Sequence, residues 1–393
     1  MVQTTIQPTS TISSRTFIFV TCLLFRLLNA YYTRTYDNPD EYWQGHEVAH
    51  ELVFGNGYLT WEWREKIRSF LHPITIALAY KVVQLLGLQN THVLVAAPRY
   101  FQATLAAVAD VATYTLAKKV IGNDIALSML FTTLCSWFNF QMAARTLSNS
   151  MEMVFTIIAL NYWPLPGIVK TTGKSWAYKW IDLAISGGPF TAMFKQRIYT
   201  WVVVIYSLLP HKEFRFIFPI VPLMLMIAAY GIQQTGSPRW RKRIMLFLVF
   251  TQLPMALYTS IWHQRGVVDV MLWMRSQPRN ISVGVLMPCH STPWYSIIHD
   301  NIPMWFLTCE PPLGESNELD EADQFYANPT EFLKTHQKDR LWPTTHLLLF
   351  DNLIPKIREY LDKEGYKECQ RFFNSHFHDD ERRRGDVVLV KQR

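Results

Sequence analysis

The sequence predicts an all-α polytopic membrane protein that ends in a small lumenal α/β domain. Of its 393 residues, 49% are hydrophobic and only 18% are charged, whereas about a quarter of the residues of a soluble domain are charged. Long apolar runs recur through the first two thirds of the chain, as transmembrane helices require. The net charge is +7. The sequence has no basic patch with interleaved aromatic residues of the kind that binds nucleic acid, so we assign this charge to lysines and arginines in the loops between membrane segments.

The first part of the chain is expected to be a short tail followed by a multi-pass region. Residues 1–14 are polar and rich in Ser and Thr, which is typical of a disordered, cytosolic tail. Residues 15–262 should form the multi-pass region, with a first lumenal loop at 33–73. Its eight candidate membrane segments are 17–32, 74–88, 100–116, 125–144, 154–169, 198–210, 216–232 and 244–262. Several are shorter than the roughly 20 residues of a spanning helix, and those at 74–88 and 198–210 are the weakest candidates.

The charge of the loops predicts the orientation of the chain. Arg26 interrupts the first apolar run and no small-residue cleavage site follows, so this run is expected to be a retained signal anchor. The basic cluster at 239–243 should be cytosolic, which places 263–393 in the lumen, and the single glycosylation sequon at Asn280 agrees. Eight spans after a cytosolic tail would instead return the C-terminal part to the cytosol. One segment must therefore fail to span or be missing, and the weakly patterned stretch 167–197 is the suspect.

From His263 onward the pattern changes to that of a small α/β domain. Strand-like runs alternate with a helical pattern at about 353–361; the runs are 281–287, 346–350 and 387–390. Cys289 and Cys309 could form a disulfide if this domain is lumenal, although spacing alone does not determine pairing. No C-x-x-C motif is present and the histidines lack metal-ligand spacing, so no metal site is expected.

The first candidate site is the polar stretch Asn38-Pro39-Asp40-Glu41, just after the first apolar run. These residue types also begin a helix well, because Asn caps, Pro fits the first position and acids favour the positive end of the helix dipole. In the functional interpretation, one carboxylate is a general base held at the membrane face, where partial desolvation tunes it. The two interpretations are compatible, because a rigid helix start is a good mount for a base.

Four further groups are candidates, each with a structural alternative. His211, Lys212, Glu213 and Arg215 lie between apolar runs and could form a clamp for a lipid phosphate, or an ordinary interfacial flank with extended basic side chains. Arg145 belongs to a polar turn that could be a simple helix connection capped by Ser148 or Asn149. The aromatic loop with Trp61 and Trp63 would suit sugar stacking or a membrane-interface belt. Arg99 and Asp110 could be functional or could form a structural salt bridge.

Several motifs together resemble glycosyltransferase family 22, which belongs to the multi-spanning GT-C class. Two of these motifs are typical of the whole family, namely the acidic motif around Asp40 and the HKEFRF block at 211–216. The aromatic loop at 57–63 and the MPCHSTP run at 287–293 are typical of one group of enzymes within it. The similar stretches cover most of the chain and lie at 36–44, 57–63, 109–111, 134–138, 145–149, 211–216, 263–266, 287–293 and 319–323.

The resemblance implies an endoplasmic reticulum membrane enzyme that uses dolichyl phosphate mannose as donor, without metal or cofactor. It would add the third mannose of the glycosylphosphatidylinositol (GPI) precursor in α1,2 linkage, with inversion. By the family pattern Asp40 would be the base with Glu41 beside it, and His211, Lys212, Glu213 and Arg215 would line the site. Between Pro166 and about Phe194 the chain is shorter than the family pattern. A sister mannosyltransferase of GPI or N-glycan assembly, and a non-catalytic truncated isoform or lipid-binding protein, are therefore the alternatives.

Overall fold

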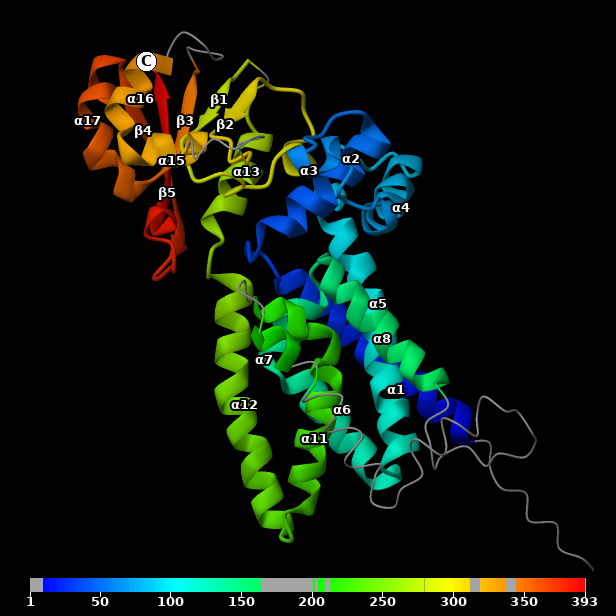
Figure 1. Ribbon diagram of the computed structural model, residues 1–393. Coiled ribbons are helices and arrows are strands. Elements are labelled where there is room, and N and C mark those ends of the chain that lie inside the picture. The colour runs from blue at the N-terminus through cyan, green and yellow to red at the C-terminus, as the bar shows by residue number, and fades with distance from the viewer. Residues whose placement is uncertain are drawn as a thin grey trace, which may run out of the picture. The chain divides into compact units, whose positions relative to one another are not determined.

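The computed structural model describes residues 10–163, 201, 204–208, 213–278, 280–311, 319–336 and 344–392 (Figure 1). The predicted shortening at 167–197, together with His211 and Lys212, lies outside the described residues. Two compact units alternate along the chain. The helical unit comprises Met1–Thr33 and Arg99–Ala256, and the sheet unit comprises Arg34–Pro98 and Leu257–Arg393. The first loop of the chain therefore belongs to the same unit as the C-terminal domain.

The helical unit is built from apolar helices of different lengths in the part of the chain that the structure describes. Its elements are α1 (Ser10–Tyr32), most of α5 (Val93–Val120), η2 (Asn123–Ile125), α6 (Ala126–Cys135), α7 (Trp137–Ala143), α8 (Ser148–Tyr162), η3 (Phe214–Ile220), α11 (Val221–Gln234) and most of α12 (Pro238–Ile261). In the part of the chain that the structure describes, the stretches Phe214–Gln234 and Pro238–Arg275 are long and apolar enough to cross a membrane.

One predicted segment of this unit, 125–144, is wrong as a single helix. The chain leaves helical geometry at Ser136, and the side chain of Ser136 then accepts the backbone N–H of Asn139 at 3.3 Å as the cap of α7. A serine at this position competes for the backbone hydrogen bonds that a continuous helix would need. The run therefore forms two shorter helices, α6 and α7.

A buried ion pair joins α1 to α5 in the helical unit. The guanidinium of Arg26 donates to both carboxylate oxygens of Asp110, at 2.7 and 2.8 Å, and both side chains are buried. The possible salt bridge at Asp110 therefore exists, with Arg26 as the partner. Arg99 instead donates to the carbonyl of Thr33 at 2.6 Å. The paired geometry satisfies charges that would otherwise be costly among apolar helices.

The sheet unit contains a five-stranded mixed sheet in the order β2-β1-β3-β5-β4. The strands are β1 (Val283–Val285), β2 (Met304–Phe306), β3 (His346–Phe350), β4 (Tyr366–Ser375) and β5 (Gly385–Gln392). Strands β2, β1 and β3 are parallel, with Val283 opposite His346, and β5 is antiparallel to β3, with Val387 opposite Phe350. All three predicted strand runs are confirmed, and the predicted helix is α17 (Ile354–Lys363).

Helical layers cover both faces of this sheet (Figure 1). Leu347 and Leu349 face the layer of α15 (Glu321–Ala327), α16 (Pro329–His336) and α17. Leu348 and Phe350 point to the opposite face, where α13 (Gly266–Arg275) packs. This alternation follows from the period of two residues along a strand, and it makes both faces of β3 part of the core.

The first loop completes the layer on the α13 face. Its helical elements are η1 (Glu41–His46), α2 (Glu47–Phe54), α3 (Trp61–Arg64) and α4 (Leu71–Leu85). Tyr42 and Trp43 of η1 belong to the same apolar cluster as Val285 and Leu348 of the sheet. The acidic motif is therefore mounted on the core of the C-terminal domain, although some 240 residues separate the two in sequence.

The weak membrane candidate at 74–88 is the short helix α4 of the sheet unit. Fifteen residues extend about 22 Å at 1.5 Å per residue, less than the roughly 30 Å of a hydrocarbon core. One face packs Ile76, Tyr80 and Val83 against Ala49 of α2. The other face exposes a stripe of large apolar side chains, namely Leu71, Ile74, Leu78, Val82 and Leu85.

Candidate active site

The helix that carries Asp40 and Glu41 begins as the sequence predicts. The side-chain oxygen of Asn38 accepts the backbone N–H of Asp40 at 2.9 Å, and Pro39 occupies the first helical position. The N–H of Glu41 is bonded to the carbonyl of Asn38 at 3.2 Å. Asp40 remains partly exposed, whereas the Glu41 side chain is fully buried. Of the two carboxylates, Asp40 is therefore the one that a substrate hydroxyl can reach.

A π-helical segment follows directly, from Glu41 to His46. This wider geometry is rare and occurs often at functional sites. It allows two adjacent aromatic residues to enter the core, where Tyr42 stacks on Tyr36 with ring centroids 5.3 Å apart and Trp43 packs 5.0 Å from Phe306. The buried rings of Tyr42 and Trp43 fix the helix immediately after Asp40. The Asp40 carboxylate itself stays at the edge of the apolar core, where it is partly exposed.

The segment Pro288–His299, which contains all of the MPCHSTP motif except its first residue, lies along this helix within the sheet unit. The hydroxyl of Tyr36 donates to the carbonyl of His290 at 2.5 Å. The indole N–H of Trp43 donates to the carbonyl of Thr292 at 2.9 Å. Sequence reasoning recognised both motifs but not this contact, because no local pattern links residues about 250 positions apart.

Glu47 extends the same row of contacts and is the most unusual carboxyl group of the unit. It is fully buried, and one of its oxygens accepts the backbone N–H groups of Trp294 and Ser296 at 3.2 and 2.9 Å. Burial raises the pKa of Glu47 from 4.5 to about 7, because desolvation outweighs the favourable hydrogen bonds from the loop. Sequence analysis missed this residue, since a glutamate in an amphipathic helix usually faces solvent.

One helical turn after Glu47, His50 makes a further contact with the segment, through His299. The Nε2 atom of His50 lies 2.8 Å from Nδ1 of His299, so one of the two rings donates to the other. Burial lowers the pKa of His50 from 6.5 to about 4, and a neighbouring His299 adds to this effect. Burial also lowers the pKa of His299, so both imidazoles favour the neutral form.

A disulfide fixes the start of the Pro288–His299 segment. Cys289 and Cys309 are bonded, so the pairing that spacing left open does occur. The imidazole of His290 lies beside this bridge and packs on Trp43 with ring centroids 4.4 Å apart. Because both thiols are used in the disulfide, this trio offers a metal ion only the imidazole nitrogen.

The two tryptophans of the aromatic loop have different surroundings. Trp63 is 7% exposed and packs against Phe70, with ring centroids 4.8 Å apart. Trp61 is half-buried and lines a cavity of about 10 Å³ together with Tyr58 and His290. That volume is close to the minimum for one water molecule, so a sugar could contact only the exposed part of Trp61. Asn280, the predicted glycosylation site, is exposed.

The remaining described candidates lie in the helical unit. Arg145 is fully buried, and its Nε donates to the carbonyl of Gln141 at 3.1 Å. Helix α8 starts at Ser148 with Leu147 at the cap position, so neither Ser148 nor Asn149 is the cap.

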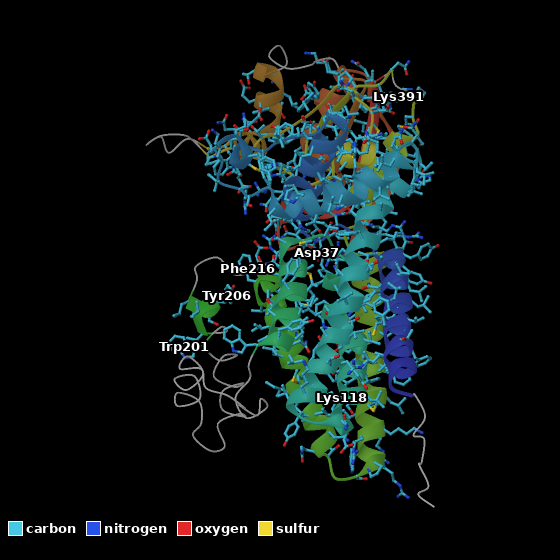
Figure 2. All side chains as sticks on the ribbon, turned by 90° about the vertical axis from the view of Figure 1, so that its right-hand side faces the viewer. Asp37, Lys118, Trp201, Tyr206, Phe216 and Lys391 are labelled. Atoms are coloured by element: carbon cyan, nitrogen blue, oxygen red, sulfur yellow. A yellow bond between two sulfur atoms is a disulfide. The ribbon has the colours of Figure 1, made fainter. Side chains whose placement is uncertain are left out.

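In the HKEFRF block, Arg215 donates to Glu213 at 3.0 Å and its guanidinium lies 5.4 Å from the ring centroid of Phe216. The internal pair neutralises one of the charges assigned to a phosphate clamp. The ring of Phe216 also stacks on Tyr206, with centroids 6.2 Å apart (Figure 2).

Asp40 has the surroundings that a general base needs, although these surroundings are not specific to one reaction. One partly exposed carboxylate sits on a capped helix start, anchored by buried aromatic residues and braced by a disulfide-linked segment. Such rigidity lets a base hold its position without reorganisation during the reaction.

Comparison with known proteins identifies the chemistry more closely. The Alg9-like mannosyltransferase family matches at residues 17–194 and 181–299. The chain is similar to Mannosyltransferase APTG1 of Arabidopsis thaliana (33% identity; 95% of this chain, 91% of the relative). It is also similar to GPI mannosyltransferase 3 of Yarrowia lipolytica (35%; 95% and 96%) and to GPI alpha-1,2-mannosyltransferase 3 of Homo sapiens (33%; 96% and 87%). No solved structure matches.

Proposed function

Since this chain belongs to the Alg9-like mannosyltransferase family, we propose that it is the α-1,2-mannosyltransferase that adds the third mannose to the GPI precursor. The chain is a glycosyltransferase. The observation that carries the proposal is similarity over 95–96% of the chain to relatives named for GPI mannosyl transfer. The donor is dolichyl phosphate mannose, and the reaction takes place at the lumenal face of the endoplasmic reticulum membrane.

The proposed reaction is a single displacement with inversion. The Asp40 carboxylate accepts the proton of the acceptor hydroxyl while the acceptor oxygen bonds to C1 of mannose. The bond from C1 to the phosphate oxygen breaks, and its electron pair leaves with dolichyl phosphate. A phosphate needs no separate acid as leaving group. Lys212 of the HKEFRF block, which the family pattern assigns to the site, stabilises its charge. Trp61 offers a stacking surface to a sugar, whereas the buried Trp63 holds the loop.

The topology proposed for the chain follows from α4. Helix α4 is shorter than a bilayer core and belongs to the sheet unit with Asn280. If it does not cross the membrane, and α6 and α7 together make one crossing, seven crossings remain among the eight apolar runs. An odd number of spans after a cytosolic tail carries 263–393 into the lumen, where an exposed sequon is used. Under this proposal the conflict in the sequence-based topology does not arise.

Complementation of cells that lack this mannosyl step tests the function. The chain should restore anchored proteins at the cell surface, and Asp40→Asn should abolish the rescue. General-base removal typically costs about 10²–10⁴-fold in rate. Asp37→Asn, the same change three positions earlier, is the matched control. Rescue by Asp40→Ala equal to that of the unaltered chain would refute the base assignment.

A second candidate is a non-catalytic, shortened isoform. The alignments to the three relatives run over 485 to 501 positions, more than the 393 residues of this chain. The two family matches meet at 181–194, near the predicted shortening. If the chain accumulates in the membrane without rescuing, and a version carrying the relatives' additional positions does rescue, the isoform interpretation is correct.

A further inference from the structure

The backbone of the Pro288–His299 segment depends on side chains from elsewhere for its hydrogen bonds. Apart from the four-residue helix α14 (Tyr295–Ile298), the segment has no regular structure. His290 and His299 adopt left-handed backbone conformations, with φ of 57° and 58°. Buried peptide groups in such a segment need partners, since an unpaired buried N–H or C=O is costly. The partners therefore decide where the segment lies.

Three of these partners come from the stretch that carries Asp40. Tyr36 and Trp43 donate to carbonyls of the segment, at His290 and Thr292. Glu47 supplies the only acceptor of the three, and it binds two N–H groups at once. Tyr36, Trp43 and Glu47 follow one another in the same order as their partners in the segment, so the contacts fix the register between the two stretches.

Glu47 stands out because its burial is otherwise unexplained. A buried carboxyl raises the free energy of the folded state unless its hydrogen bonds compensate. The second oxygen of Glu47 has no hydrogen-bond partner among the described residues. An apolar residue of similar size would fit the surrounding aromatic core more simply. What an apolar residue cannot do is accept the N–H groups of Trp294 and Ser296.

We propose that Glu47 is a positioning residue, whose buried oxygen binds the Trp294 and Ser296 amides and so fixes the helix that carries Asp40. Asp40 lies seven residues, or about 10 Å along a helix, from Glu47. A base displaced by about 1 Å can lose about 10²-fold in rate. The inference rests on the proposed function, in which Asp40 is the base.

Two substitutions separate the acceptor role from the carboxylate itself. Glu47→Gln keeps a carbonyl oxygen in the same place and should transfer mannose at a rate within about twofold of the unaltered chain. Glu47→Leu keeps the volume but removes the acceptor, and should lower kcat about 10- to 100-fold with little change in KM. Glu51→Leu, one turn further along α2, is the control, because Glu51 makes no side-chain hydrogen bond or ion pair among the described residues.

Amide hydrogen exchange provides a readout that does not need activity. In the purified full chain, the Trp294 and Ser296 amides should exchange slowly, and Glu47→Leu should accelerate them at least tenfold while Glu47→Gln and Glu51→Leu do not. If the chain proves inactive, the proposed function fails while this comparison still tests the positioning contact. Fast exchange in the unaltered chain, unchanged exchange in Glu47→Leu, or a Glu47→Gln variant as inactive as Glu47→Leu would each overturn the proposal.

Discussion

The raised pKa of Glu47 predicts a pH-dependent term in the stability of the sheet unit. Burial raises this pKa from 4.5 to about 7, so the folded state favours the protonated carboxyl. The stabilisation is fully present below pH 4.5 and is lost as the pH rises through 7. Each pKa unit corresponds to about 1.4 kcal/mol, so the loss amounts to about 3 kcal/mol.

Five histidines of the sheet unit titrate with the opposite sign and must be separated from this term. Burial lowers the pKa of His50 and of His290 from 6.5 to about 4, and it also lowers the pKa of His299, His346 and His378. Each therefore adds stability as the pH rises towards 6.5, because the unfolded state binds the proton more readily. The effect of Glu47 is isolated by subtracting the curve of Glu47→Gln, which keeps all five histidines and cannot ionise at this position.

The assay is thermal unfolding in detergent, followed by tryptophan fluorescence between pH 4.5 and 8. At pH 4.5 the unaltered chain and Glu47→Gln should unfold at similar temperatures. At pH 8 the variant should unfold about 6–12 °C higher, from about 2–4 °C per kcal/mol for a unit of this size. Two curves that stay parallel from pH 4.5 to 8 would refute the argument that Glu47 is buried and titrates near 7.

Three other changes test separate features of the fold. Asp110→Asn should destabilise the helical unit by about 3–5 kcal/mol, because it leaves the buried Arg26 charge uncompensated. The double variant Arg26→Leu with Asp110→Leu should unfold close to the temperature of the unaltered chain. An equal loss of stability in the single and the double variant would contradict the ion-pair account. Replacing Cys289 and Cys309 with serine should cost about 3 kcal/mol, since the bridge closes a 20-residue separation, and a reductant should then have no further effect on the melting temperature. The unaltered chain should run faster on a gel after endoglycosidase treatment, because one glycan is removed. Asn280→Gln should already run at this faster position, with no further change on treatment. An unaltered chain whose mobility does not change on treatment would argue against a lumenal Asn280.

The sequence predicted the local structure of this protein better than its tertiary contacts. Strands such as 346–350 are short apolar runs whose period and composition are visible directly. The start of the helix at Asn38 also follows from residue types alone. The break at Ser136 was missed, because a serine inside an apolar run is compatible with a continuous helix. Strand β4, with its mostly exposed polar residues, was missed because it lacks the usual alternation.

The candidate site shows the same division. Asp40 was recognised from its motif, and its partly exposed position agrees with the proposed role. Glu47 carried no signal, since only a fold that brings Trp294 and Ser296 to it makes a buried carboxyl tolerable. The partner of Asp110 was also not predicted, because pairing between helices depends on rotation and register. Spacing in sequence does not encode these quantities.

The alternation of the two units along the chain has a consequence for biosynthesis. The N-terminal part of the sheet unit, Arg34–Pro98, leaves the ribosome long before the other part, Leu257–Arg393. At about 5–20 residues per second, translating the intervening stretch takes on the order of ten to thirty seconds. During that time Tyr42 and Trp43 have no sheet to pack on. These aromatic side chains therefore stay without their core until β3 and β5 have been synthesised, so the N-terminal part of the sheet unit is an expected client of chaperones.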